Sequence, residues 1–197
     1  MMSFSFLLSV ALAVVAVFAF ERTMGARGGS RHYWLIGVGT FGFLAVTLPF
    51  VQLFPEMVAP LAAEIRKLAL IVGSTCLALG AVHTHVRDFE ERSGTAFLAI
   101  ASVGFLISLY AGEPRIGLLV NAFALISMLA LALTRLDTHP RSAPWLATAS
   151  GLLLASISLP AMIAQAIGLG EEAITIVLFA LALLAFAETA RRSTRTS

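Results

Sequence analysis

Three glycines in one apolar stretch have the spacing of a nucleotide-binding loop. Gly37, Gly39 and Gly42 match the Gly-x-Gly-x-x-Gly pattern that binds dinucleotides in other folds. In those folds the pattern follows a β-strand, and the N-terminus of the next helix faces the phosphates. Here the glycines lie inside the apolar stretch 34–49, and no βαβ unit fits the surrounding sequence. We therefore interpret them as small residues that let helices approach closely in a membrane.

Polar groups inside apolar segments are the other candidates for chemistry, because lipid does not solvate them. Asn121 is expected either to hydrogen-bond a neighbouring helix or to line a pathway. Glu188 is the deepest acidic residue, and we expect it either to pair with a neighbouring arginine or to couple a proton to transport. The remaining pathway or ligand candidates are two prolines with nearby amides and hydroxyls: Pro49, Pro160, Gln52, Gln165, Ser74, Thr75, Ser156 and Ser158.

Residue sets typical of an enzyme or a metal site are not recognisable in the sequence. There is no Ser-His-Asp set, zinc-protease motif or pair of carboxylates placed to face one cavity. His83 and His85 are two residues apart, which on a helix directs them about 200° apart. The lone Cys76 allows no internal disulfide. We predict a protein that is not an enzyme and has no metal and no cofactor. A net charge of only +2 gives no reason to expect a nucleic-acid partner.

The composition is that of a protein dissolved in a lipid bilayer. Hydrophobic residues make up 59% of the chain and charged residues 12%. Soluble domains are about 45–50% apolar and about 25% charged. So few charges do not cover a water-facing surface, and we predict an all-α, polytopic protein of the cell membrane.

Seven apolar runs have about the 17–25 residues that a membrane-spanning helix needs. We predict spans at 3–20, 33–53, 65–83, 95–111, 116–134, 145–167 and 173–189. The first run lacks the basic stretch of a signal peptide and is interpreted as a retained helix. If the N-terminus lies outside, ten of the 13 Lys and Arg residues fall on the inner side. The positive-inside rule then predicts that the C-terminus lies inside.

The second and sixth runs share a pattern. Residues 34–49 read WLIGVGTFGFLAVTLP, and residues 145–160 read WLATASGLLLASISLP. Both begin at one of the two tryptophans and end at a proline inside an apolar run, and an offset of 111 residues relates them. The same offset places the first run on the fifth. This pattern predicts a parallel three-plus-one-plus-three repeat in a single membrane domain, 1–197. Its parts are a three-helix unit at 1–93, a connector helix at 94–112 and a second unit at 113–197.

This layout resembles that of the SWEET sugar carriers and their PQ-loop relatives. The resemblance is one of architecture, since no proline here is followed by glutamine, and the repeated prolines fall in the second helix of each unit rather than the first. The trimeric intracellular cation channels share the layout, but their triple-glycine motif is missing. A rhodopsin needs a lysine in its last helix, and the single lysine, Lys67, lies in the third run. We therefore assign no family.

Two functions are compatible with this sequence. The first is a small transporter or channel-like facilitator for a small solute, gated by helices 2 and 6 where Pro49 and Pro160 kink them. Each proline frees the carbonyl four residues earlier, that of Ala45 or Ser156. The alternative is a non-catalytic sensor or receptor module, or an accessory subunit of a larger membrane complex. Its partner would be a membrane protein or a cytosolic protein at the inner loops, and in either case the chain is compatible with a homo-oligomer.

Overall fold

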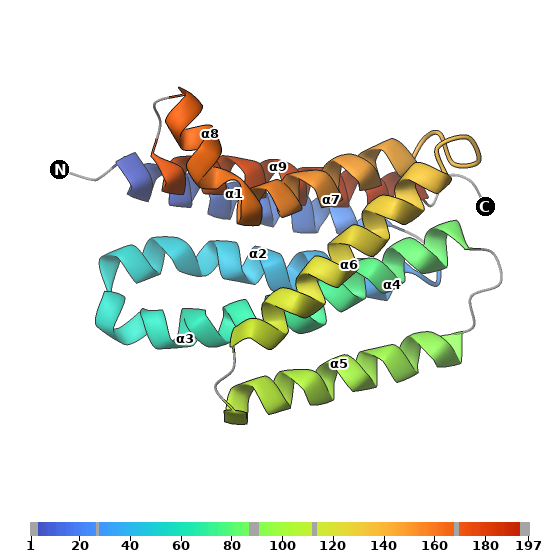
Figure 1. Cartoon of the computed structure of the whole chain (residues 1–197), viewed down its shortest axis with the longest axis horizontal. Helices are drawn as coiled ribbons and strands as arrows, with labels where there is room; N and C mark the ends of the chain where they lie inside the picture. The colour runs from blue at the N-terminus through green and yellow to red at the C-terminus, as the bar shows by residue number, and fades with distance from the viewer. Residues whose placement is uncertain (1–3, 27, 87–90, 112–113, 168–169, 194–197) are drawn as a thin grey trace.

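Apolar stretches divided by Pro, Gly and charged residues form helices throughout the described chain. The computed structural model describes residues 4–26, 28–86, 91–111, 114–167 and 170–193 (Figure 1), and it contains no β-strand in these ranges. The elements are α1 (Phe4–Met24), α2 (Arg31–Leu53), α3 (Pro55–Leu68), the π-helical turn η1 (Ala69–Gly73), α4 (Ser74–His85), α5 (Glu91–Ala111), α6 (Pro114–Thr134), α7 (Ala143–Ser158), α8 (Pro160–Ile167) and α9 (Glu171–Ser193).

Six helical segments of the described chain are long and apolar enough to cross a membrane. They are α1, α2, the continuous segment α3–η1–α4, α5, α6 and α9. Helix α7 is apolar but has only 16 residues, about 24 Å against a hydrocarbon core of about 30 Å. The prediction of an all-helical, multi-pass membrane protein is therefore supported, with six candidate spans.

The helices pack side by side in a closed ring. Helix α1 packs on α2, α2 on η1 and α4, α4 on α6, α6 on α7, α7 on α9, and α9 again on α1. Helix α5 lies outside this ring, against α3, η1, α4 and α6, and Figure 1 shows it at the lower edge of the bundle. Within the ring, α2 also contacts α9.

Glycines set the close approach of α2 and α4. A Cβ atom on Gly37 would lie 2.7 Å from the Cγ and Cδ2 atoms of Leu77. A Cβ atom on Gly80 would lie 3.0 Å from the ring of Trp34, which is fully buried. Gly39 and Gly42 lie inside α2 as well and face α1. All three glycines of the pattern therefore lie inside a helix beside a neighbouring helix, which confirms the packing interpretation.

The third segment is longer than its apolar run. We expected a helix over 65–83, but the helical segment runs from Pro55 to His85. Its first part, α3, is amphipathic: Ala62 and Ile65 are buried, while Arg66 is exposed. Because one face of an amphipathic helix is polar, the first turns of α3 do not form a continuous apolar run. The predicted span therefore began too late.

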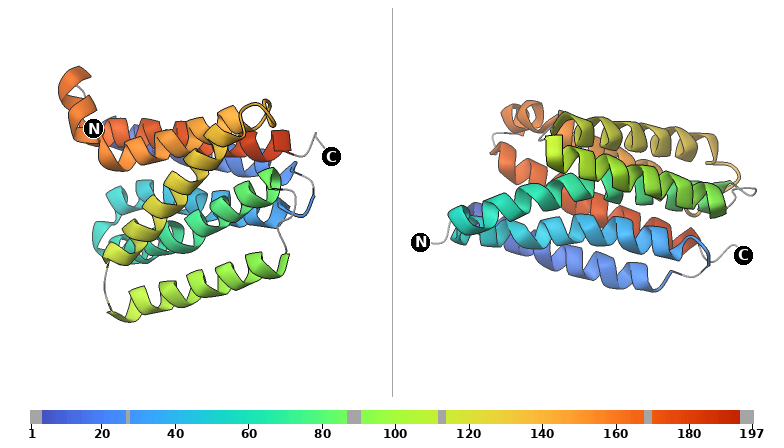
Figure 2. Two further views of the ribbon diagram at one scale, coloured as in Figure 1. Left: turned by 45° about the vertical axis from the view of Figure 1, so that its right-hand side comes forward. Right: turned by 90° about the horizontal axis from the view of Figure 1, so that it is seen from below.

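The sixth run is divided into two helices, contrary to the single helix expected over 145–167. Helix α7 ends at Ser158, Leu159 has φ −118° and ψ 3°, and Pro160 begins α8. Figures 1 and 2 show α8 leaning away from the bundle. Proline disfavours the helical conformation of the residue before it, which explains the break. Pro49, by contrast, is buried inside the continuous helix α2, where α1, α4 and α9 pack along the helix.

Candidate functional site

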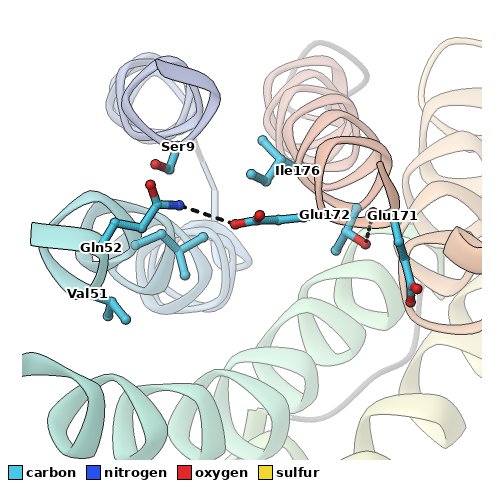
Figure 3. Close-up of a pocket in the computed structure, with 8 residues that line it drawn as sticks. Ser9, Val51, Gln52, Glu171, Glu172 and Ile176 are labelled. Atoms are coloured by element: carbon cyan, nitrogen blue, oxygen red, sulfur yellow. Dashed lines mark hydrogen bonds between the residues drawn. The ribbon is translucent and has the colours of Figure 1, made fainter. Parts of the chain in front are cut away.

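A cavity of ≈ 540 Å³ opens where α2 ends and α9 begins (Figure 3). We call it the vestibule. Its polar lining comes from three helices: Ser9 of α1, Gln52 of α2, and Glu171, Glu172 and Thr175 of α9. The remaining described lining residues are the apolar Leu48, Val51 and Ile176. The site therefore joins segments from the beginning and the end of the chain.

One hydrogen bond crosses the vestibule. The Nε2 atom of Gln52 donates to Oε1 of Glu172 at 3.2 Å, and Figure 3 shows the two side chains extended toward each other from α2 and α9. Glu171 and Glu172 lie in the first turn of α9, where the positive end of the helix dipole favours carboxylates. Among the described lining residues none is basic. The vestibule is thus equipped to receive a cation or a hydrogen-bond donor.

Ser9 is buried in the vestibule wall. Its hydroxyl donates to the carbonyl oxygens of Phe6 and Ser5 at 2.9 Å and 3.1 Å. About one to three turns further along the three helices the packing is apolar: Leu12 and Ala45 are buried, and the rings of Phe41 and Phe179 meet edge to face at 6.0 Å between centroids. This apolar packing lies along α1, α2 and α9 between the vestibule and the opposite end of the bundle.

Glu188 lies at the opposite end of the bundle, where its carboxylate contacts three arginines. Nη2 of Arg22 lies 2.8 Å from Oε2, and Nη2 of Arg191 lies 2.6 Å from Oε1. Arg192 also donates to Oε1 through Nε. The Glu188 side chain is only 7% exposed. Of the two roles that we considered for Glu188, the geometry provides the pairing with neighbouring arginines, and it adds Arg22 from α1.

Both tryptophans lie at the Glu188 end of the bundle, but they are buried to different extents. The Nε1–H of Trp34 donates to Oγ1 of Thr84 on α4 at 3.3 Å. The ring of Trp145 lies under the guanidinium of Arg192 on α9, 5.0 Å from the ring centroid. Trp34 is fully buried, whereas Trp145 is 37% exposed. The repeated residue therefore faces a helix in both cases, but only Trp145 remains accessible.

The two hydroxyl candidates of the third segment hydrogen-bond the backbone of their own helix. Thr75 donates to the carbonyl of Ile71 at 2.7 Å, and Ser74 donates to the carbonyl of Leu70. Both carbonyls belong to η1, a π-helical turn that alters the regular hydrogen-bond ladder. Asn121 is buried in α6, and within the described residues its Oδ1 atom has no hydrogen-bond partner.

The candidates near the second proline are dispersed. Ser156 is buried and donates to the carbonyl of Leu153 at 2.8 Å, while Ser158 is exposed at the end of α7. Pro160 begins α8, which also contains Gln165, but the side chain of Gln165 lies outside the described part of the structure. Of the predicted residues whose side chains the structure describes, Gln52 is the one that lines the vestibule.

Sequence reasoning missed Ser9, Glu171, Glu172 and Arg22 as site residues. The two glutamates directly precede the apolar run 173–189, and two acids before such a run are a signal of a helix start. That signal places them at a helix terminus but does not say which helix lies opposite. Ser9 and Arg22 carry no comparable signal, because their roles depend on the packing of α1 against α9.

The fold and these two polar ends define a helical multi-pass membrane protein. In the described ranges, no cluster of three or more His, Cys, Asp and Glu side chains is arranged to hold a metal ion. No family model, curated protein or solved structure matches the chain.

Proposed function

We propose that the chain crosses the cell membrane seven times, with its N-terminus outside and its C-terminus inside. The beginnings of α1 and α9 both line the vestibule, and their ends meet at Arg22 and Glu188, so the two helices run in the same direction. If both span the membrane, the number of crossings is odd. Helix α7 must then cross as well, in addition to the six candidate spans. The excess of arginine at the Glu188 end supports the orientation.

The seven crossings form two parallel three-helix units joined by α5. At an offset of 111 residues, the starts of α6 and α7 fall within one residue of those expected from α1 and α2. In each unit the first helix packs on the second and the second on the third. The third helix of each unit then packs on the first helix of the other, α4 on α6 and α9 on α1. These correspondences support the repeat.

The chain acts in this proposal as a carrier or channel-like facilitator for a small cationic solute. The observation that carries this function is the vestibule, in which helices of both units present Gln52 and Glu172 to one ≈ 540 Å³ cavity. Two carboxylates favour a cation, and the amide provides a second hydrogen-bonding group. Because α2 and α9 pack through apolar side chains beyond the vestibule, where the rings of Phe41 and Phe179 meet, passage in this proposal requires α2 and α9 to separate. No catalytic step and no cofactor is involved.

Glu172→Gln is expected to reduce uptake of an organic cation about tenfold, because it removes one of the two carboxylate charges, whose attraction for a cation at a distance of about 4 Å is about 1–4 kcal/mol. The measurement is uptake of radiolabelled choline into proteoliposomes, with glycerol as a neutral comparison. Glu56→Gln is the matched control, since Glu56 is an exposed glutamate at the start of α3, outside the vestibule lining. Equal choline uptake by the wild-type protein and Glu172→Gln would contradict a cation carrier that uses this vestibule.

Pro160→Ala is expected to change the uptake rate more than Pro49→Ala. The bend lies at Pro160, between α7 and α8, whereas α2 continues through Pro49. Alanine restores a backbone N–H and permits helical geometry at Leu159, so α7 and α8 join more readily. Initial rates in the same proteoliposomes provide the comparison. Unchanged rates in both variants would show that neither proline acts as a hinge.

The second candidate function is a sensor module or an accessory subunit. The observation that favours it is the outer face of α5, which exposes large apolar residues: Phe97, Ile100, Val103, Leu106, Ile107 and Tyr110. A second membrane chain would cover this face, and a homo-oligomer would do so with another copy. In mild detergent this function predicts copurification of a partner together with no solute uptake by the isolated chain.

A further inference from the structure

A second cavity of ≈ 580 Å³ lies at the opposite end of the bundle from the vestibule, between α1, α7 and α9. We call it the arginine groove. Its mouth carries Arg22, Arg191, Arg192 and Glu188, and its described floor is formed mainly by apolar side chains, among them Leu152 and Leu181. Trp145 lines the groove between these two parts.

The groove carries an excess of positive charge. Among its described lining residues, three guanidinium groups face one carboxylate, so the arginines outnumber the acidic groups by two. The carboxylate of Glu188 contacts all three arginines and so holds them together at the mouth. The arginine side chains remain between 30% and 38% exposed. The mouth therefore presents a fixed cluster of donors suited to an anionic phosphate group.

The floor of the groove has the depth of one membrane leaflet. Leu181 and Arg191 are ten residues apart on α9, which corresponds to about 15 Å along a helix. Half of a hydrocarbon core of about 30 Å is the same length. An apolar floor of this depth below a cationic mouth fits an acyl chain below a headgroup. A soluble anion would need only the mouth.

We propose that the arginine groove binds an anionic phospholipid of the adjacent leaflet. The phosphate lies among Arg22, Arg191 and Arg192, and an acyl chain lies along α7 and α9. Basic pockets between membrane helices are known to receive anionic headgroups. The bound lipid would join α1 and α7 to the end of α9, which lies between them.

Quenching of tryptophan fluorescence tests this site directly. Trp145 lines the groove, whereas Trp34 is fully buried between α2 and α4. The protein is reconstituted in phosphatidylcholine vesicles that contain either phosphatidylglycerol or phosphatidylcholine with brominated acyl chains. Half-maximal quenching is expected at a roughly tenfold lower mole fraction of brominated phosphatidylglycerol, because a cluster of three arginines around one carboxylate favours the anionic lipid. In Trp145→Phe the quenching should disappear.

Paired variants separate this site from general surface charge. The double variant R22Q/R192Q removes two charges from the groove and should reduce the preference to near unity. The control R66Q/K67Q removes two charges from the last turn of α3, outside the groove lining, and should retain the preference. R22K keeps the charge and should retain most of the preference for phosphatidylglycerol. That result would show that the fold tolerates substitution at this position.

Three results would overturn the proposed lipid site. The first is equal quenching by the two brominated lipids. The second is a preference for phosphatidylglycerol that persists in R22Q/R192Q. The third is loss of this preference in the control R66Q/K67Q. Displacement of the quenching by millimolar glycerol 3-phosphate would instead identify a site for a soluble anion, and that outcome also contradicts a lipid site. Solute uptake plays no part in these measurements, so they are independent of the proposed transport.

Discussion

Gly37→Ala is expected to lower the melting temperature of the detergent-solubilised protein by several degrees. The new Cβ atom would lie 2.7 Å from Cγ and Cδ2 of Leu77 and 3.0 Å from the backbone nitrogen of Leu77. A side-chain tip could rotate away, but the backbone of α4 has to move. Overpacking of this kind costs about 1–3 kcal/mol, which corresponds to about 3–10 °C in a chain of this size.

Gly151→Ala provides the matched control for Gly37→Ala. Gly151 lies inside α7, and among the described atoms nothing lies within 4 Å of the Cβ position. Alanine favours a helix over glycine by about 1 kcal/mol, so this variant should melt at the wild-type temperature or slightly above it. Thermal unfolding followed by circular dichroism checks both. If Gly37→Ala also melts like the wild type, the close approach of α2 and α4 is wrong.

Glu188→Gln is expected to destabilise the protein by about 1–3 kcal/mol. Removing one partner of a buried ion pair costs about 3–5 kcal/mol, and the partial exposure of the three arginines reduces that figure. Glutamine keeps the volume of the side chain but leaves Arg22, Arg191 and Arg192 without their carboxylate. The measurement is again the melting temperature in detergent.

Glu64→Gln is the control for Glu188→Gln, because Glu64 forms a more exposed pair with Lys67 within α3. Such a pair contributes about 0–1 kcal/mol. A double variant, R22A/E188Q, should be less destabilised than the sum of its single variants, since both remove the same contact between α1 and α9. If Glu188→Gln instead leaves stability unchanged and abolishes proton dependence of uptake, Glu188 acts in proton coupling rather than as a structural partner.

The predicted span boundaries were most accurate where a segment is apolar on every side. For α2 we expected 33–53 and find Arg31–Leu53, and for α6 we expected 116–134 and find Pro114–Thr134. The boundaries were wrong at α3, which is amphipathic, and at Pro160, where one run became two helices. The two similar Trp–Pro segments thus form different structures, because α2 packs on α1, α4 and α9 along its length, whereas the main described contacts of α8 are with α9 and α7.

The candidate site was only partly predictable. Gln52 was singled out for its position after Pro49, and it does line a cavity. Its partner Glu172 is 120 residues away in the chain, and at the other end Arg22 and Glu188 are 166 residues apart. Neither pairing has a local pattern, because similar apolar faces do not specify which helices become neighbours.

The amino-acid sequence by itself determined that this is an all-helical protein suited to lipid. The reason is local: in a bilayer each segment must satisfy its own backbone hydrogen bonds, and runs of apolar residues mark such segments. Only the tertiary structure decided that Gln52 faces Glu172 and that three arginines surround Glu188. Those contacts follow from the order in which helices close the ring, and that order depends on packing between residues far apart in the chain.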